Sequence, residues 1–370
     1  MSFTAIASPP AQRPVARRLL RAASALTTPL LPDDYLTYLN PLWSTREPRG
    51  RVDAVIPETA DSATIWLRVG PDWPVHTPGQ YVRVGVDVNG VRHWRTYSLT
   101  STVARDDHRI AITVKAIQDG LVSHHLVHRT TRGTIVRLAP PAGEFVLPAP
   151  RPERVLLLTA GSGVTPAMGM LRHLQTTGAD GLDAVTHVHL APSRDDVIFG
   201  DELRRLDRRH AGFTLHEHHD DRDGIFSPAR LQALVPQWRE HETWACGPAG
   251  LLDALTEAFE TAGIPERLHV ERFRPVLAGA VAAQGTGGTV TFRASQRTVQ
   301  ADASTPLLVA GEDAGALLPS GCRMGICNSC VGRLCSGAVR DLRTGELQDA
   351  PDMLIRTCTS AAAGDVEIDL

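Results

Sequence analysis

Three closely spaced cysteines near the C-terminus are the residues whose spacing most directly indicates chemistry. Cys322, Cys327 and Cys330 follow the pattern C-x4-C-x2-C, which is the spacing of plant-type 2Fe–2S sites. Such a cluster needs a fourth thiolate from farther along the chain, and we expect Cys358 to supply it. Cys335 is too near in sequence to complete the site and lies in an expected strand. The pattern therefore predicts a metal site formed by the first three cysteines and Cys358.

Zinc and disulfide chemistry explain these cysteines less well. Structural zinc sites usually pair their ligands in two knuckles with roughly two to four residues between ligands, and here there is no second pair and no nearby histidine. A disulfide framework is typical of short, cysteine-rich chains, whereas this chain has six cysteines in 370 residues. An iron–sulfur cluster requires an electron source, so we expect the rest of the chain to contain one.

A second group of candidate residues lies at the end of an expected strand. Arg95 can bind a phosphate bidentately, the ring of Tyr97 can lie on a flat heterocycle, and the hydroxyl of Ser98 can bond a ring nitrogen. Farther along, residues 120–123 predict a glycine-led helix N-terminus whose free N–H groups suit a phosphate. A glycine and a serine at a helix start are most often plain caps. The two patterns together are more informative than either one alone.

Two glycine-rich breaks form a third group. Residues 154–160 are a continuous apolar run, typical of a buried parallel strand, and they lead into the loop 161–166. A second expected strand, 242–246, breaks at Gly247 and Pro248. Both breaks follow strand carboxyl ends, where open parallel sheets bind ligands, so we expect them to line one crevice. Pro166 replaces the third glycine of the dinucleotide fingerprint, and a tight turn alone could explain an isolated G-x-G.

Ser193 and Arg194 follow the next expected parallel strand. In nucleotide-binding sheets this position contacts the adenosine ribose, where an arginine favours a 2′-phosphate. The pair therefore predicts NADPH, with NADH as the alternative. Asp195 and Asp196 come directly afterwards and could instead pair with Arg194 on a solvated loop.

Composition excludes several function classes. The net charge of −3 does not indicate a nucleic-acid partner, and a 42% apolar fraction suits globular cores. No apolar run reaches the length of about 18 residues that a transmembrane helix needs. The N-terminus lacks a signal-peptide pattern, and the cluster motif implies a reducing cytoplasm.

Turn signals and hydrophobic patterns predict the elements that position these residues. We expect an N-terminal extension (1–47), an antiparallel barrel of short strands (48–150), a doubly wound parallel sheet (151–275), a linker (276–288) and a small C-terminal domain (289–370). In the extension, residues 15–31 predict a basic amphipathic helix that Pro29 and Pro32 end. It could lie on an anionic membrane or pack across the protein.

Expected packing and secondary structure complete this division. An apolar clamp on the barrel is predicted from Tyr35, Leu36, Tyr38, Leu39, Leu42 and Trp43. In the C-terminal domain we expect a hairpin of residues 289–292 and 297–299, a helix over 305–318, and strands over 331–339 and 365–369.

With these motifs in this order, residues 48–370 resemble the ferredoxin–NADP+ reductase superfamily, in the subgroup with a C-terminal β-grasp ferredoxin domain. The resemblance implies that Arg95 binds the flavin pyrophosphate, Tyr97 stacks on the flavin, and Ser98 contacts N5. It implies flavin-side contacts from Arg95, Thr96, Tyr97, Ser98, Gly120, Leu121, Val122 and Ser123. It implies nicotinamide-side contacts from Gly161, Ser162, Gly163, Val164, Thr165, Pro166, Cys246, Gly247 and Pro248, beside the Ser193 and Arg194 predicted above. Phe273 would cover the flavin ring, and Ser98 and Cys246 would be the catalytic residues near flavin N5.

The resemblance also implies an activity. Electrons would pass from NADPH to FAD, with FMN as the alternative, then to the 2Fe–2S cluster and on to a partner protein. The extension, with Tyr38 to Ser44, is similar to that of actinobacterial reductases serving membrane acyl-CoA desaturases and di-iron oxygenases, which implies such an acceptor and a place at the inner face of the membrane. The alternatives are a reductase of a ring-hydroxylating dioxygenase or cytochrome P450, and a non-catalytic redox sensor.

Overall fold

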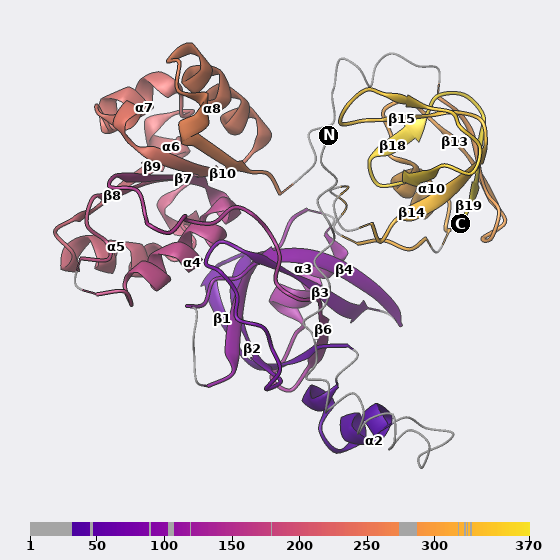
Figure 1. Cartoon of the computed structure of the whole chain (residues 1–370), viewed down its shortest axis with the longest axis horizontal. Helices are drawn as coiled ribbons and strands as arrows, with labels where there is room; N and C mark the ends of the chain where they lie inside the picture. Colours follow the sequence, from indigo (N-terminus) through magenta and orange to yellow (C-terminus); the bar gives the residue numbers. More distant parts are fainter. Residues whose placement is uncertain are drawn as a thin grey trace.

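Three sheet-based units follow one another along the chain and are arranged around the middle of the molecule (Figure 1). The structure is a computed structural model, and it describes residues 32–44, 47–88, 90–102, 107–118, 120–178, 180–273, 287–316, 318–321, 323, 325 and 328–370. Among these residues no helix is both long and apolar enough to cross a membrane. The expected helix over 15–31 lies outside the described residues, as does most of the expected linker.

The first unit is an antiparallel barrel whose strands are ordered β4-β3-β6-β1-β2-β5. Its elements are β1 (Arg49–Thr59), β2 (Ser62–Val69), β3 (Tyr81–Val88), β4 (Val91–Ser98), β5 (Arg109–Lys115), α3 (Leu121–His128) and β6 (Ile135–Leu138). A bridge between Leu99 and Ile112 joins the two edges. Alternate valines of β3 are buried in the barrel core, as the alternating sequence predicted.

The second unit is a parallel sheet with strand order β11-β10-β7-β8-β9. Its strands are β7 (Val155–Ala160), β8 (Val185–Ala191), β9 (Phe213–His219), β10 (Glu242–Cys246) and β11 (Leu268–Glu271), and its helices are α4 (Val164–Leu174), α5 (Gly200–Arg209), α6 (Asp220–Asp223), α7 (Pro228–Leu234) and α8 (Ala249–Thr261). Helices α4 and α5 cover one face and α7 and α8 the other (Figure 1). Burial on both faces explains the continuous apolar run of β7.

Short 3-10 helices punctuate the chain. They are η1 (Pro41–Trp43), η2 (Gly161–Gly163), η3 (Arg194–Asp196), η4 (Trp238–Glu240) and η5 (Pro265–Arg267). Two of them, η2 and η3, follow the carboxyl ends of β7 and β8, so they mark the edge of the sheet where ligands bind.

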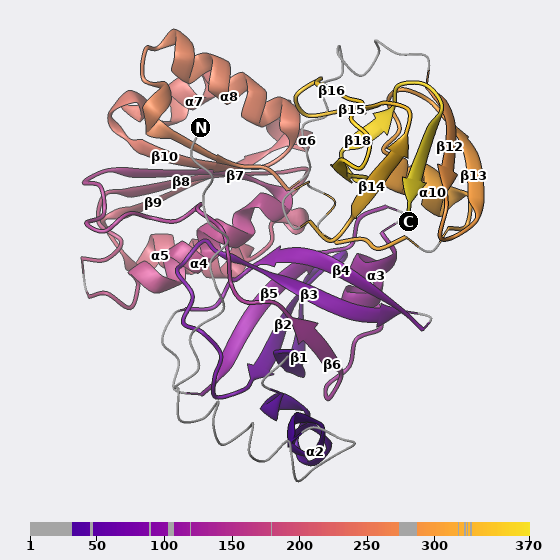
Figure 2. The same ribbon diagram turned by 45° about the vertical axis from the view of Figure 1, so that its right-hand side comes forward.

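The C-terminal unit is a mixed sheet, ordered β13-β12-β19-β14-β17, with α10 packed against it and a three-stranded sheet β16-β15-β18 beside it. Its elements are β12 (Gly288–Phe292), β13 (Arg297–Ala301), α10 (Leu307–Asp313), β14 (Val331–Ser336), β15 (Val339–Asp341), β16 (Leu347–Gln348), β17 (Leu354–Arg356), β18 (Ser360–Ala362) and β19 (Val366–Asp369). Figure 2 shows this unit lying over β4 and α3 of the barrel. The predicted fold class is confirmed.

Two predicted elements of this unit are shorter than expected. The helix expected over 305–318 ends at Asp313, because Gly315 takes the left-handed φ of +76° that follows many helix ends. The strand expected over 331–339 divides at Gly337, where φ is +85° and an added Cβ would lie 2.0 Å from the Asp365 carbonyl oxygen. Strands β16 to β18 are too short for their sequence period to be recognised.

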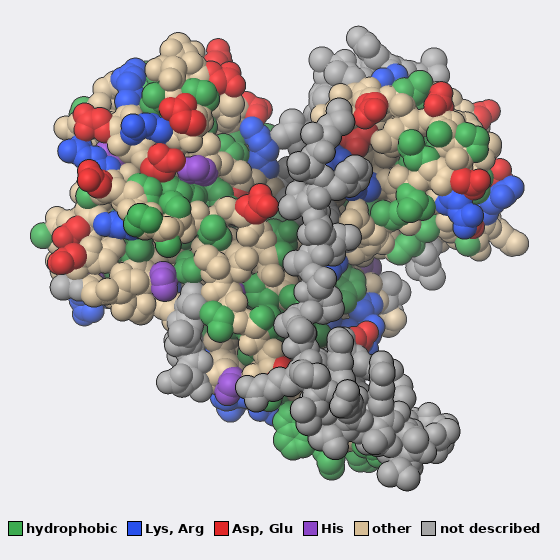
Figure 3. Space-filling model, viewed as in Figure 1, with side chains coloured by type: hydrophobic (Ala, Val, Ile, Leu, Met, Phe, Trp, Pro, Cys, Tyr) green, Lys and Arg blue, Asp and Glu red, His purple; other side chains and the backbone are tan. Residues whose placement is uncertain are grey.

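The predicted apolar clamp is largely wrong. Pro32 is the first residue of a described helix, α2 (Pro32–Leu39), in the first-turn position that proline tolerates. Leu42 is buried against the barrel, but Tyr35, Tyr38, Leu39 and Trp43 are all exposed, Tyr38 by 91%. We call these four side chains the α2 patch. Hydrophobic side chains are visible at this end of the molecule (Figure 3).

Candidate functional site

A cavity of about 1490 Å³ lies where the three units meet. It is larger than the roughly 300–1,000 Å³ of an ordinary small-molecule pocket. The barrel contributes β4 and the start of α3. The parallel sheet contributes the loop 161–166, called here the first glycine loop, and the end of β11. The C-terminal unit contributes residues between Glu312 and Arg323. Its size and composite walls suit an extended ligand that contacts all three units.

Strand β4 forms the first wall of the cavity. Arg95, Thr96, Tyr97 and Ser98 all line it, and the antiparallel register with β3 places Ser98 opposite Tyr81. The hydroxyls of Thr96 and Ser98 are buried and have no hydrogen-bond partner among the described residues. Because buried polar groups are almost always paired, these two hydroxyls fit a ligand that carries polar ring atoms.

Burial also sets the charge of this wall. It raises the pKa of the Tyr97 phenol, so the ring stays neutral at physiological pH. Burial first, and then the neighbouring Arg323 guanidinium, lower the pKa of Arg95 from its ordinary value of 12.5. Arg95 donates from Nη1 to the Trp94 carbonyl oxygen at 2.8 Å. The wall therefore offers a fixed cation beside a flat neutral ring.

The turn before α3 forms the corner of the same wall. Gly120, Leu121, Val122 and Ser123 line the cavity, and Gly120 is the residue that precedes the helix. The Ser123 hydroxyl donates to the Gly120 carbonyl oxygen at 3.0 Å and accepts from the Ile117 amide at 3.2 Å. Since this hydroxyl is held by its own turn, a phosphate here would meet the first amides of α3.

The first glycine loop contributes fewer side chains than the sequence predicted. Only Ser162 and Thr165 of this loop line the cavity, and the Thr165 hydroxyl donates to the Ser162 carbonyl oxygen at 3.0 Å. Val164 and Pro166 are buried in the sheet domain instead. A Cβ on Gly163 would lie 2.1 Å from the Cys246 carbonyl oxygen. The structure thus brings the two glycine-rich breaks into contact, as expected from their positions at strand ends.

Cys246 lies behind the cavity wall. It is the last residue of β10, is fully buried, and is not among the residues that line the cavity. Burial, and then the nearby Glu271 carboxyl, raise the pKa of its thiol, so the thiol is protonated. Gly247 and Pro248 also do not line the cavity. In this structure, therefore, the break after β10 supports the first glycine loop from behind.

Two of the four predicted cluster ligands are described. Cys330 and Cys358 are buried in the core of the C-terminal unit, at 1% and 4% exposure. The Thr357 hydroxyl donates to the Cys330 carbonyl oxygen at 2.8 Å, which holds the two cysteine-bearing segments together. Cys322 and Cys327 lie outside the described residues.

The rest of the cysteine loop has an unusual backbone. Arg323, Gly325 and Asn328 all have positive φ angles, of 58°, 73° and 55°. An added Cβ on Gly325 would lie 2.9 Å from Thr359 Cγ2, so a side chain does not fit there. The thiol of Cys335, by contrast, contacts the Arg333 carbonyl oxygen at 3.8 Å on β14. The described residues of the loop thus turn sharply, whereas Cys335 belongs to a strand.

Comparison with known proteins connects these features. A model of the 2Fe-2S iron-sulfur cluster binding domain matches residues 290–363, and a model of the oxidoreductase FAD-binding domain matches residues 67–147. An NADPH oxidoreductase of Mycobacterium tuberculosis is 48% identical over 95% of this chain and 92% of that protein. Phthalate dioxygenase reductase is similar in structure, with a TM-score of 0.61, 26% identity, and 88% and 98% of the two chains covered. The chain belongs to the phthalate dioxygenase reductase-like ferredoxin reductases.

This ferredoxin reductase is an electron-transfer oxidoreductase whose cofactors are FAD, a 2Fe–2S cluster and NADPH. The chain is also similar to a glycine betaine monooxygenase reductase subunit of Pseudomonas aeruginosa, at 28% identity over 90% of this chain and 99% of that one. The residues present fit these groups. The unpaired buried hydroxyls of Thr96 and Ser98 suit a flavin ring, and the thiols of Cys330 and Cys358 are ligands that iron–sulfur clusters use.

Glu271 is a site residue of the reductase that the sequence interpretation missed. It ends β11 beside Cys246 in the parallel register, and it lines the cavity. Its Oε2 is buried without a hydrogen-bond partner among the described residues, and burial raises the pKa of the carboxyl to about 8. From the segment 270–273 the sequence predicted only Phe273 as a site residue, and Phe273 does line the cavity and is partly exposed. A carboxyl at a strand end beside a glycine break was the available signal.

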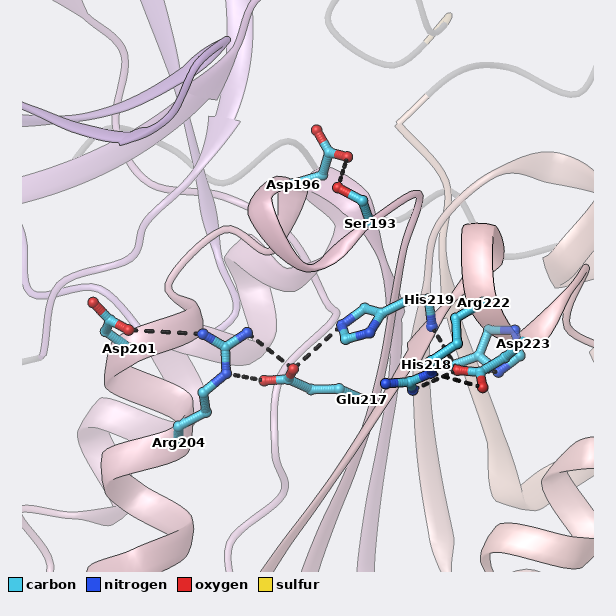
Figure 4. A network of polar contacts seen from close by, with 9 residues as sticks. All are labelled: Ser193, Asp196, Asp201, Arg204, Glu217, His218, His219, Arg222 and Asp223. Atoms are coloured by element: carbon cyan, nitrogen blue, oxygen red, sulfur yellow. Dashed lines mark hydrogen bonds and ion pairs between the residues drawn. The ribbon is translucent and has the colours of Figure 1, made fainter.

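Ser193 and Arg194 lie away from the cavity, at the carboxyl end of β8. The Ser193 hydroxyl donates to Asp196 at 2.7 Å (Figure 4), and the Arg194 side chain is exposed. The amide of Asp221 donates to the Pro192 carbonyl oxygen, so the ends of β8 and β9 adjoin. This edge continues the row of strand ends that begins at the cavity, which is where a dinucleotide can extend.

Carboxylates dominate the end of β9 in this reductase. Glu217 accepts from Arg204 at 2.7 and 2.9 Å and approaches His219 at 3.3 Å, and Arg222 is paired with Asp223 at 2.7 Å (Figure 4). The two arginines are therefore already neutralised by carboxylates. Arg194 remains the exposed cation next to this edge for which no ion pair with a described residue occurs.

Proposed function

We propose that this ferredoxin reductase takes electrons from NADPH and passes them, through FAD and the 2Fe–2S cluster, to a di-iron desaturase or oxygenase. The observation that supports this route is the single cavity lined by the flavin-side strand, the first glycine loop and the cysteine-loop segment. When bound, FAD supplies the exchange between the two-electron chemistry of NADPH and the one-electron chemistry of the cluster. We place the domains at residues 48–150, 151–275 and 289–370, with 1–47 as an extension and 276–288 as a linker.

Each wall of the cavity has a role in this proposal. Arg95 binds a flavin phosphate, Tyr97 lies along the flavin, and the unpaired Ser98 hydroxyl bonds its ring. The first amides of α3 bind a second phosphate oxygen. The protein's contribution is to fix these groups in one cavity, because hydride transfer depends on the distance and angle between the two rings.

Glu271 holds a proton at the inner end of the cavity. Because the pKa of its carboxyl is about 8, the group is neutral at physiological pH and ionises in alkaline solution. A neutral carboxyl can donate a hydrogen bond to an acceptor in the cavity, whereas a carboxylate there would repel the negative charge that hydride transfer delivers.

We expect Glu271→Gln to remove an alkaline limb from the pH profile. In the natural enzyme, the kcat for NADPH-driven ferricyanide reduction should decline above about pH 8, approaching a tenfold loss per pH unit, as the buried carboxyl ionises. The glutamine amide is neutral at every pH, so its profile should stay flat. Glu144→Gln, which changes an exposed carboxyl that also lines the cavity, is the matched control and should keep the decline. An identical decline in Glu271→Gln would contradict this role.

We expect Arg194→Ala to weaken the binding of NADPH and to leave the binding of NADH nearly unchanged. The exposed guanidinium lies where a 2′-phosphate would be, and losing one charge-assisted contact should raise KM for NADPH about tenfold. NADH lacks that phosphate, so its KM should change little. Steady-state assays with both coenzymes measure the ratio. Equal changes for both coenzymes would show that Arg194 does not distinguish them.

The choice of acceptor rests on the extension. The α2 patch exposes two tyrosines, a leucine and a tryptophan together, and such aromatic groups are enriched at membrane interfaces. The preceding sequence carries Arg13, Arg17, Arg18 and Arg21, which suit an anionic surface. We therefore propose a membrane-associated acceptor and a location at the inner face of the cytoplasmic membrane.

The relatives favour a second candidate acceptor. Phthalate dioxygenase reductase and the glycine betaine monooxygenase reductase subunit are both named for oxygenases. Reconstitution of NADPH oxidation with a di-iron desaturase in vesicles, and separately with a ring-hydroxylating oxygenase or a cytochrome P450, distinguishes these acceptors. The desaturase should sustain turnover that stops when the α2 patch is changed to serines. A redox sensor would reduce its cluster once and show no sustained NADPH oxidation with any acceptor.

A further inference from the structure

A charged cluster crosses the boundary between the barrel and the ferredoxin domain. His93 and Arg95 on β4 line the cavity from one side, and Glu312 and Arg323 line it from the other. Arg323 Nη2 donates to Glu312 Oε1 at 2.6 Å, and both side chains are mostly buried. A separate contact, from Arg83 Nη1 to Ser329 Oγ at 3.2 Å, joins the same two domains. The cysteine loop thus adjoins the flavin-side wall directly.

The positive charges of this cluster exceed its negative charges. Three other cations that line the cavity each have their own carboxylate: Arg92 with Asp87 at 2.9 Å, Lys115 with Asp61 at 2.7 Å, and Arg272 with Asp253 at 2.7 Å. Arg95 forms no ion pair among the described residues, and the carboxylate that acts on its charge is Glu312, which Arg323 already engages. Two guanidinium groups therefore share one carboxylate. In a cavity of low dielectric constant this arrangement favours a bound anion.

Arg323 also has an unused donor. Its Nε is buried and lacks a hydrogen-bond partner among the described residues. Its backbone has a φ of +58°, a left-handed conformation that is costly for a side chain of this size. A buried, unpaired N–H beside a cavity is the arrangement expected of a ligand-binding residue.

We propose that Arg323, from the ferredoxin domain, is a second phosphate-binding arginine of the FAD site and acts on the same anion as Arg95. The inference rests on the proposed placement of FAD along β4. Since the two arginines belong to different domains, an anion between them lowers their mutual repulsion and draws the domains together. FAD binding and ferredoxin-domain docking therefore stabilise each other, with Glu312 orienting Arg323 and competing with the phosphate for it.

Flavin affinity of the full-length protein tests this role without using activity. Flavin is removed, and the quenching of flavin fluorescence is titrated with FAD and with riboflavin, which lacks phosphate. Arg323→Gln should weaken FAD binding about tenfold or more and leave riboflavin binding unchanged. Arg343→Gln is the matched control, because Arg343 contacts the cysteine loop at the Gly325 carbonyl oxygen but does not line the cavity. It should bind both flavins normally.

Two further variants separate this inference from the proposed flavin site. Glu312→Gln removes the competing carboxylate, so FAD should bind a few-fold more tightly, an effect opposite to that of Arg323→Gln. Arg95→Gln should weaken FAD binding whether or not Arg323 contributes. If Arg95→Gln weakens FAD binding and Arg323→Gln does not, the role proposed for Arg323 is wrong and the proposed FAD site along β4 is retained. If neither variant changes FAD affinity, the placement of FAD is wrong. Equal weakening of FAD and riboflavin by Arg323→Gln would also overturn the role, since it would indicate lost packing.

Discussion

Replacing Cys358 by serine should abolish cytochrome c reduction and leave NADPH-driven ferricyanide reduction largely intact. A serine hydroxyl does not replace a thiolate as a cluster ligand, and Cys358 is buried beside Cys330 in the core of the ferredoxin domain. The flavin-side and nicotinamide-side walls belong to other units, so electron entry should persist. We expect at least about a hundredfold loss with cytochrome c and less than about a threefold loss with ferricyanide, which accepts electrons from flavin directly.

Cys335→Ser is the matched control for this result. Cys335 is a third described cysteine of the same domain, and its thiol contacts the Arg333 carbonyl oxygen on β14. The variant should retain the absorption and the electron paramagnetic resonance signal of the reduced cluster, as well as cytochrome c reduction. If the cluster signals were normal in Cys358→Ser and lost in Cys335→Ser, the fourth ligand would be Cys335 and not Cys358.

Local patterns predicted much of this molecule because their physical causes are local. A continuous apolar run predicts the buried parallel strand β7, and alternation of apolar and polar residues predicts β3. The two glycine-rich breaks were expected to meet because parallel strand ends share one edge, and Gly163 does touch Cys246. The barrel, the parallel sheet and the cluster motif followed from such segments, whereas FAD and the β-grasp domain were implied by the family resemblance.

The remaining site features depend on distant parts of the chain. Nothing adjacent in sequence shows that Glu312 and Arg323 would face Arg95, since that contact exists only when two domains dock. The raised pKa of Glu271 comes from burial, which neighbouring residues do not reveal. The exposure of Tyr38 was missed for a related reason: an apolar residue indicates burial on average, whereas the α2 patch is an exception to that average.

Gly163→Ala should separate the two glycine-rich breaks and impair NADPH use. The backbone of Gly163 has an ordinary φ of −62°, so strain is not the reason for glycine. The reason is contact, because a Cβ would lie 2.1 Å from the Cys246 carbonyl oxygen and 2.5 Å from its carbonyl carbon. Both are backbone atoms and cannot rotate away. Overpacking of this kind costs about 1–3 kcal/mol, and displacement of Ser162 and Thr165 should raise KM for NADPH roughly ten- to a hundredfold.

The matched control is a second glycine of the same domain, whose substitution by alanine should destabilise the domain through backbone strain and not through a steric contact. Gly263 follows α8 with a φ of +73°, and an added Cβ there meets nothing within 4 Å. Gly263→Ala should therefore cost about 1–2 kcal/mol of backbone strain and leave KM for NADPH unchanged. Thermal unfolding and steady-state kinetics of both variants give the comparison. If the two variants lose similar stability and neither raises KM, the contact between the breaks supports the fold alone and does not position the nicotinamide loop.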